Sequence, residues 1–243
     1  VGLFPYMKDS LLWEDELVCD MFKTNVGETE EKTLHRAQSK LLKRLLDGED
    51  IAVSAPTSFG KSFVIDAFIA IKQPQNVVII VPTIALMDET RRRLFKKFAN
   101  RYNIITTTDV DLGGNNIFIF PQERALTYAN EIGDIDILII DEFYKSSIEV
   151  DKEREPALIM CIINLGTKAK QRYFLAPNID ELQDNPFTQG MSFEKVDFKT
   201  VFLEVNNLYP QILEGKDKSD ILLNLYRQTN GKSLIYAGTF SEI

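Results

Sequence analysis

Cysteine and histidine are scarce in this chain of 243 residues, which has two cysteines and a single histidine. Cys19 and Cys161 provide no disulfide framework of the kind that holds small secreted domains together. With His35 as the one histidine, a zinc site of cysteine and histidine ligands is also disfavoured. These scarcities favour a cytoplasmic protein that folds around a hydrophobic core.

The sequence also lacks a hydrophobic run that could cross a membrane. Its longest apolar stretch, residues 77–82, is far shorter than the roughly 20 residues that a bilayer requires. Residues 1–5 show no basic segment followed by an apolar one, so neither a signal peptide nor a membrane partner is expected. Because the first residue is valine rather than methionine, we expect the chain to begin inside a longer polypeptide.

Positive charge is in deficit, with 28 lysines and arginines against 36 acidic residues and a formal net charge of -8. This balance argues against a protein held to nucleic acid by its overall charge, although local basic strips can still bind phosphates. Hydrophobic residues make up 44% of the chain, which is enough for a real core. The length predicts one large domain, or one domain and a fragment of another.

Apolar, β-branched runs alternate with helical stretches through the middle of the chain. Strands are predicted at residues 51–55, 77–81, 104–107, 117–120, 135–140, 173–176 and 201–205. Helices are predicted at residues 8–24, 33–46, 61–71, 85–99, 122–129 and 153–165. Continuous apolar strands that alternate with helices are typical of an α/β fold with a mostly parallel sheet flanked by helices on both faces.

The pattern divides the chain into three expected parts. Residues 1–30 form an N-terminal helical extension, and residues 31–205 form the main α/β domain. Residues 206–243 read as a linker and the truncated start of a second α/β domain, with a helix at 217–228 and a strand at 233–237.

The run Ala55-Pro56-Thr57-Ser58-Phe59-Gly60-Lys61-Ser62 directly follows a predicted strand and opens a predicted helix. This is the context of a phosphate-binding P-loop, in which backbone N–H groups and a helix N-terminus surround the phosphates. Lys61 would reach the β- and γ-phosphates of ATP, and the Ser62 hydroxyl would ligate Mg²⁺. Alanine stands where the motif usually has its first glycine, so an ordinary strand-to-helix turn is the alternative.

Two acidic residues, Asp141 and Glu142, end the apolar strand predicted at residues 135–140. A parallel sheet presents the C-terminal ends of its strands at the edge where ligands bind. Asp141 would hold the Mg²⁺, and Glu142 would act on the attacking water as general base. Two solvated acids at a strand end are the alternative, which the preceding P-loop makes much weaker.

Together these two motifs resemble motifs I and II of superfamily-two helicases of the DEAD-like or DExH group. The resemblance extends over most of residues 33–240 and implies a RecA-like P-loop NTPase domain. It also implies ATP and Mg²⁺ as cofactors, single-stranded or duplex DNA or RNA as partner, and a second RecA-like domain of the same protein. Residues 232–239 resemble motif IV, the first strand of that second domain.

Further positions follow from the resemblance alone. Gln38 matches the glutamine of the Q motif, which contacts adenine. Pro82 and Thr83 match motif Ia, and Gln122 and Arg124 match motif Ib; both motifs contact the sugar-phosphate chain. Without the family, these residues read as a polar helix residue, helix caps and a surface pair.

Asn178 lies where motif III would be, and it would couple nucleic-acid binding to Asp141 in place of the usual serine and threonine. The helix after Thr83 carries the most basic segment of the chain, Arg91, Arg92, Arg93, Lys96 and Lys97. This basic run is either a solvated face or a set of phosphate contacts.

We therefore expect an ATP-dependent helicase domain that couples hydrolysis to translocation on, or unwinding of, DNA or RNA. Alone it should be poorly active, because an arginine finger from a second domain can contribute roughly 10³–10⁵ in rate. The alternative is a P-loop ATPase switch that does not unwind nucleic acid. A binding module without hydrolysis is disfavoured by the intact Lys61, Ser62, Asp141 and Glu142.

Overall fold

The computed structural model describes residue 5 and residues 13–107, 112–143, 155–177, 179–182, 186–197 and 207–228. The chain divides into two units, Val1–Thr200 and Val201–Ile243, and each is described by itself. The predicted strands at residues 201–205 and 233–237 and the motif IV match lie outside the described residues.

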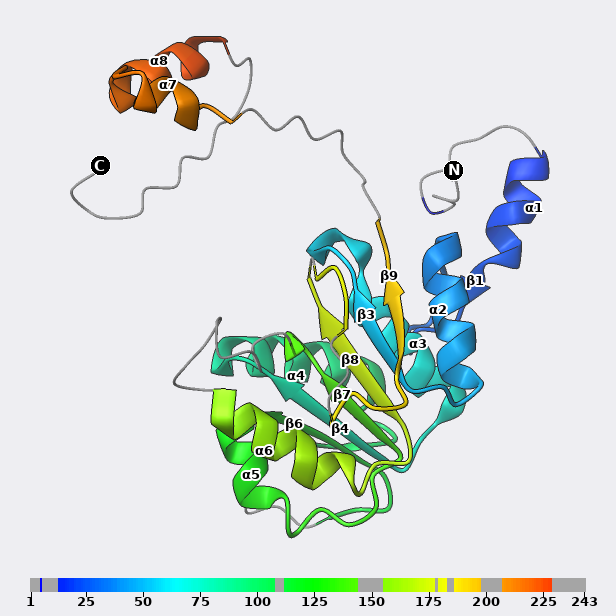
Figure 1. Cartoon of the computed structure of the whole chain (residues 1–243). Coiled ribbons are helices and arrows are strands. Elements are labelled where there is room, and N and C mark those ends of the chain that lie inside the picture. The colour runs from blue at the N-terminus through cyan, green and yellow to red at the C-terminus, as the bar shows by residue number, and fades with distance from the viewer. Residues whose placement is uncertain are drawn as a thin grey trace. The chain divides into compact units, whose positions relative to one another are not determined.

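A seven-stranded sheet, in which every strand pair is parallel, forms the centre of the first unit (Figure 1). The strand order is β5-β6-β4-β7-β8-β3-β9. The bounds are β3 (Ile51–Ser54), β4 (Asn76–Val81), β5 (Asn103–Ile105), β6 (Asn116–Pro121), β7 (Ile137–Ile140), β8 (Arg172–Ala176) and β9 (Ser192–Lys195). The predicted parallel α/β fold is confirmed, and the C-terminal ends of all the strands meet at one edge.

Five helices cover the two faces of this sheet (Figure 1). One face carries α2 (Arg36–Leu46), α3 (Lys61–Lys72) and α4 (Ile84–Phe98), and the other carries α5 (Gln122–Tyr128) and α6 (Glu155–Gly166). Alternate strand residues supply the two cores, so Val77 and Ile79 pack with α2–α4 while Val78 and Ile80 pack with α5 and α6. Burial on both faces explains why the strands read as unbroken apolar runs.

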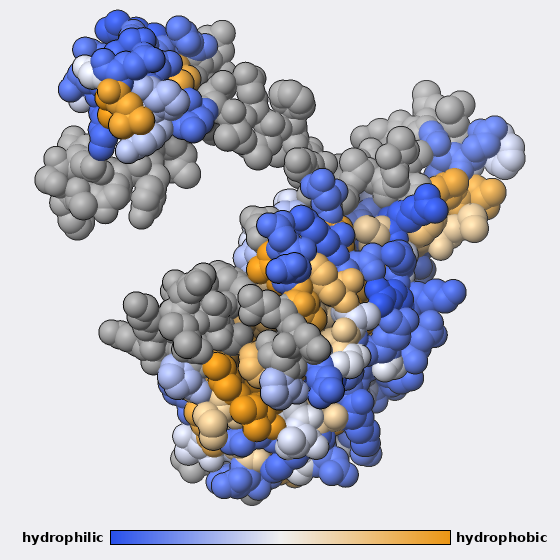
Figure 2. Space-filling model, in the orientation of Figure 1, coloured by the Kyte–Doolittle hydropathy of each residue, from blue (hydrophilic) through white to orange (hydrophobic). Residues whose placement is uncertain are grey.

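The N-terminal part consists of α1 (Trp13–Met21) and an antiparallel pair, β1 (Lys23–Thr24) and β2 (Lys32–Thr33). The prediction of a helix from residue 33 is wrong at its start, because Thr33 lies in β2 and His35 caps the first turn of α2. The exposed side of α2 is hydrophilic, as Figure 2 shows. No helix among the described residues combines the length and the apolarity that crossing a bilayer demands.

Strand β9 at the sheet edge was not predicted. It pairs with β3, and its Glu194 carboxylate accepts hydrogen bonds from Lys40 at 2.7 Å and Arg44 at 2.6 Å on α2. Tertiary pairing therefore makes a strand of a segment that lacks an apolar run. The second unit contains α7 (Tyr209–Leu213) and α8 (Lys218–Gln228), and neither helix has a buried residue.

Candidate functional site: a nucleotide pocket at the sheet edge

The predicted P-loop connects β3 to α3 at the C-terminal edge of the sheet. After Ala55 the chain makes a short 3-10 turn, Thr57–Phe59, and α3 begins at Lys61 as predicted. Gly60 adopts the left-handed conformation, with φ 73° and ψ 44°. This backbone favours glycine, and a Cβ atom at Gly60 would also lie 2.8 Å from Gln38 Nε2, so the Gln38 amide would have to shift.

The sheet order brings the acidic pair to the same edge as the P-loop. Only β8 separates β7, which ends before Asp141, from β3, which ends before Ala55. Neighbouring strands lie about 4.8 Å apart, so the two loops emerge roughly 10 Å from one another. Glu142 has a left-handed backbone, with φ 55°, and its N–H donates to Asp141 Oδ1 at 3.0 Å.

Electrostatic effects tie Lys61 to the two acids. Burial lowers the pKa of the Lys61 ammonium, and the charges of Asp141 and Glu142 oppose that shift. Burial raises the pKa of Asp141, and the positive charges of Lys61 and Arg93 oppose that rise. The Lys61 ammonium donates to the carbonyl oxygen of Ala55 at 3.3 Å. The lysine and both carboxylates therefore lie close enough at this edge for their charges to act on one another.

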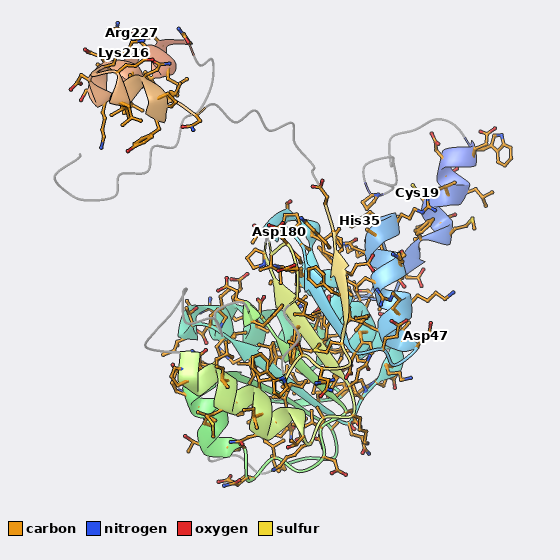
Figure 3. The ribbon with its side chains drawn as sticks, viewed as in Figure 1. Cys19, His35, Asp47, Asp180, Lys216 and Arg227 are labelled. Atoms are coloured by element: carbon orange, nitrogen blue, oxygen red, sulfur yellow. The ribbon has the colours of Figure 1, made fainter. Side chains whose placement is uncertain are left out.

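A pocket of about 220 Å³ lies beside the P-loop. Its lining comes from the β2–α2 segment, the P-loop and the first turn of α3, and it includes Leu34, His35, Gln38, Ser58, Phe59 and Phe63. His35 is at the N-terminal end of α2 (Figure 3). Gln38 lies on the first turn of α2, where the Q-motif match predicts contact with adenine.

The Gln38 amide joins α2 to the P-loop. Its Oε1 accepts from the His35 N–H at 3.1 Å, and its Nε2 donates to the carbonyls of Phe59 at 2.7 Å and Gly60 at 3.4 Å. In return, His35 Nδ1 accepts from the Gln38 N–H at 3.3 Å, which completes a capping box. His35 Nε2 lies 3.3 Å from the Phe59 carbonyl, so the neutral ring carries its proton on Nε2.

The residues predicted to contact nucleic acid follow the neighbouring strands β4 and β6. Thr83 caps α4, because its hydroxyl oxygen accepts from the Leu86 N–H at 3.2 Å. Pro82 and Gln122 are buried. Arg124 Nη1 donates to the Thr106 carbonyl and lies 3.6 Å from the Met87 sulfur. The capping alternative therefore holds for Thr83, and Arg124 braces α5 against α4, while contact with phosphates stays a prediction for both.

The basic run on α4 is only partly directed to solvent. Arg93 and Lys97 bind the buried carboxylate of Asp66 on α3, and Arg91 and Arg92 pair with Asp88 on their own helix. Neither of the two original interpretations, a solvated face or a set of phosphate contacts, fits Arg93 and Lys97. Asn178 lies outside the described residues, so its coupling role stays a prediction.

Comparison with known proteins shows the family of this chain. The DEAD/DEAH box helicase family matches residues 35–176, from the helix cap through the end of β8. The chain belongs to the DEAD/DEAH box helicase family. It is also 31% identical over 248 residues to Anti-bacteriophage protein B of Escherichia coli (strain K12), a match that covers 97% of this chain and 34% of that protein. The chain thus spans about a third of the length of this curated relative.

A solved structure, the Sulfolobus solfataricus SWI2/SNF2 ATPase core in complex with dsDNA, matches with a TM-score of 0.48 and 17% identity. That match covers 59% of this chain and 31% of the solved chain.

The donor set of this DEAD/DEAH box domain fits a nucleotide-bound Mg²⁺ rather than a metal held by protein alone. Within the described ranges, no group of three or more His, Cys, Asp and Glu residues forms a metal site. Mg²⁺ is usually bound by one or two protein ligands together with phosphate oxygens and water. Ser62 and Asp141, predicted as its ligands, lie on the P-loop helix and directly after β7.

Sequence reasoning missed His35 as part of the candidate site. The spacing His35-x-x-Gln38 is that of a capping box, although histidine is an unusual first member. Sequence reasoning also missed Asp66. Its apolar neighbours on α3 are buried, but the sequence does not show that Arg93 and Lys97 of another helix bind its carboxylate.

Proposed function

We propose that this chain is the ATP-binding domain of a helicase that couples ATP hydrolysis to translocation on, or unwinding of, DNA or RNA. The observation that carries the proposal is the strand order β7-β8-β3, which brings Lys61 and the pair Asp141 and Glu142 to one sheet edge, next to a pocket bounded by Gln38 and Gly60. Loops of this kind, placed at the C-terminal ends of parallel strands, are where α/β proteins bind nucleotides.

The chain's own residues divide the chemistry between them. The N–H groups of residues 57–62 and the Lys61 ammonium bind the phosphates, and the lysine charge offsets negative charge on the γ-phosphate. Glu142 accepts a proton from the attacking water. Ser62 and Asp141 hold Mg²⁺, which when bound neutralises charge on the phosphate oxygens.

The orientation of Gln38 supports adenine as the preferred base. Both contacts of its Nε2 are with P-loop carbonyls, whereas Oε1 accepts one bond from the His35 N–H and has a second lone pair. An acceptor favours the amino group of adenine over the O6 carbonyl of guanine. We therefore expect ATP to be preferred to GTP, and Gln38→Glu, which keeps that acceptor but loses the donors to the P-loop, to weaken ATP binding.

Nucleic acid would run along the β4–β6 half of the edge, past Pro82, Thr83, Gln122 and Arg124. A second RecA-like domain of the same protein would close over the nucleotide and supply arginines. Closing and opening of that cleft would couple hydrolysis to movement of a strand.

The deciding experiment measures ATP hydrolysis by the full-length protein with and without single-stranded DNA and RNA. Stimulation by a strand, lost in Lys61→Ala and kept in Lys43→Ala on the exposed side of α2, is the expected result. Equal hydrolysis with and without nucleic acid would instead favour the ATPase switch. Hydrolysis that survives Lys61→Ala would refute the site itself.

We further propose that the biological setting is defence against bacteriophage, with the protein acting in the cytoplasm. The support is the likeness, over nearly the whole chain, to a protein named for anti-bacteriophage activity. Cells that express the full-length protein should show a reduced plaque count, and the Lys61→Ala variant should lose that protection. Equal plaque counts for vector, variant and unaltered protein across a phage panel would contradict this setting.

A further inference from the structure

Four charged side chains from three segments meet under the P-loop helix. Asp66 on α3 accepts from Arg93 and, at 2.8 Å, from Lys97, both on α4. Lys97 also binds Glu28, in the connection between β1 and β2, at 2.9 Å. The Asp66 side chain is 1% exposed and that of Lys97 is 7% exposed. We call these four residues the α3–α4 charge cluster.

Stability alone does not explain the α3–α4 charge cluster. Taking charges out of water is costly, and replacing a buried ion pair by apolar residues of similar volume is often neutral or stabilising. The surrounding core consists of such residues, among them Val64, Ile65 and Leu94. A buried pair does fix one geometry, because each charge must keep its partner.

One member of the cluster reaches the predicted site directly. Arg93 Nη1 donates both to Asp66 and to the carbonyl oxygen of Ser62, at 3.3 Å. Ser62 lies in the first turn of α3, and its hydroxyl is the predicted ligand of Mg²⁺. Lys97 binds the same Asp66 carboxylate, and its ammonium lies over the Phe63 ring, 5.7 Å from the centroid; in the described part of the chain it makes no hydrogen bond to Ser62.

We propose that Arg93 is a positioning residue for the metal end of the P-loop. Its guanidinium, fixed by Asp66, holds the Ser62 backbone and thereby sets where the Ser62 hydroxyl lies. The planar guanidinium suits this task, since the two hydrogens on Nη1 point to two acceptors in a fixed geometry, where lysine offers a flexible, rotating ammonium. The inference rests on the proposed function, because it assumes that Ser62 holds a nucleotide-bound cation.

Arg93→Met and Lys97→Met form a matched pair for the test. Each removes one cation beside Asp66 and leaves the other in place, and each replaces a long side chain by an apolar one. Only the change at position 93 removes the bond to Ser62. Binding of a fluorescent ATP analogue to the full-length protein is titrated with Mg²⁺ and, separately, measured in EDTA.

Arg93→Met should raise the Mg²⁺ concentration for half-maximal binding about tenfold, the effect of losing one bond to a charged group. Its affinity for the analogue in EDTA should stay within about twofold of the unaltered protein. Lys97→Met should leave the Mg²⁺ requirement unchanged. Loss of its contact with Phe63 would change the affinity for the analogue by the same factor with Mg²⁺ and in EDTA.

Equal shifts in the Mg²⁺ requirement of both variants, or none in either, would overturn the proposal. If Arg93→Met does not fold, Arg93→Lys and Lys97→Arg repeat the comparison with every charge kept. In that pair only Arg93→Lys should raise the Mg²⁺ requirement, by about threefold, because it loses the rigid guanidinium plane that fixes both bonds. A wild-type protein that binds no nucleotide with Mg²⁺ would refute the proposed function instead, which keeps the two failures apart.

Discussion

Glu142 stands out among the residues of the site because its backbone is left-handed, with φ 55°. A non-glycine residue in this region costs roughly 1–3 kcal/mol and persists only where its surroundings hold it, often at functional sites. The bond from its N–H to Asp141 is one such restraint. We expect this backbone conformation to set the direction of the Glu142 carboxylate, which is predicted to act as the base.

Glu142→Gln should therefore separate binding from hydrolysis. The amide keeps the size of the side chain but takes up no proton, so turnover of ATP should fall about 10²–10⁴-fold. Nucleotide affinity should remain within about threefold, since the phosphates are bound by the P-loop. Steady-state ATPase rates and equilibrium binding of an ATP analogue measure the two effects, and hydrolysis at an unaltered rate would exclude Glu142 as the base.

His35 should make stability depend on pH. Burial lowers its pKa from the ordinary value of 6.5, so the folded state binds this proton more weakly than the unfolded chain. The free energy of unfolding that His35 contributes is complete above about pH 6.5 and is lost as the pH falls through the lower, folded-state pKa. Protonation would place a hydrogen on Nδ1, which accepts the Gln38 N–H, and would break the cap of α2.

His35→Ser keeps a capping oxygen without a titrating ring. Urea unfolding at pH 7.5 and pH 5.0 should show a smaller pH effect in the variant, by about the 1 kcal/mol that a helix cap contributes. Because His35 is the only histidine, the difference between the two proteins isolates this group. The same pH effect in both would contradict the role of His35.

The Tyr173 hydroxyl is fully buried in β8 and has no hydrogen-bond partner among the described residues. Tyr173→Phe should leave the free energy of unfolding unchanged or raise it by up to about 2 kcal/mol, because an unsatisfied buried hydroxyl is costly. Tyr102→Phe is the control, since its hydroxyl donates to the Pro74 carbonyl at 2.8 Å, and it should lose about 1 kcal/mol. Chemical denaturation compares the two, and a larger loss at Tyr173 would reveal a hidden partner.

At the scale of elements, the N-cap residue of α4, Thr83, has two candidate roles. Thr83 caps the helix and is predicted to bind a nucleic-acid phosphate. Thr83→Ala should lower the free energy of unfolding by about 1 kcal/mol through loss of the cap, and it should also weaken strand binding. Thr83→Asp should keep the cap, because aspartate is a good N-cap residue, yet repel a phosphate. Thermal unfolding measures the cap, and strand binding by the full-length protein measures the phosphate contact. If Thr83→Asp binds the strand as well as the unaltered protein does, Thr83 serves as a helix cap and not as a phosphate contact.

The sequence predicts best those elements whose residues carry the signal locally. Strands β3, β4, β6, β7 and β8 lie within a residue or two of their predicted positions because each is an apolar run buried on both faces. The P-loop and the acid pair could be predicted because Gly60, Lys61 and the two carboxylates each follow an apolar strand, in the order that nucleotide sites require. Their roles stay predictions.

Other features depend on partners far away in the sequence. Strand β9 exists through pairing with β3, and Arg93 turns inward because Asp66 lies on another helix. A run of basic residues looks the same whether it faces solvent or a buried carboxylate. These contacts between distant parts of the chain could not be predicted from the local sequence pattern.

At the scale of the whole molecule, ligand binding should be visible as stability. Nucleotide with Mg²⁺ at about 100 times its Kd should add roughly 2.7 kcal/mol to the free energy of unfolding, if only the folded state binds. Lys61→Ala should abolish that gain, whereas the exposed Lys43→Ala should retain it. Differential scanning fluorimetry with and without nucleotide measures this, and a gain that persists in Lys61→Ala would place the ligand elsewhere.

Residues 1–243 alone should hydrolyse ATP slowly. The arginines that complete such sites are expected on a second domain, and an arginine finger can account for about 10³–10⁵ in rate. Comparison of this chain with the full-length protein, in the presence of a nucleic-acid strand, tests the expectation. Equal turnover by both would mean that the residues of this chain suffice.

The close approach of Gly60 to Gln38 links two parts of the pocket that are usually considered apart. A methyl group at position 60 would press on Gln38 Nε2 at 2.8 Å before any ligand is present. Since Gln38 borders the space expected for the base, a change in the loop expected to bind the phosphates would be felt at the other end of the nucleotide. The residue at position 60 is therefore constrained from α2 as well as from its own loop, because a larger side chain there would have to displace the Gln38 amide.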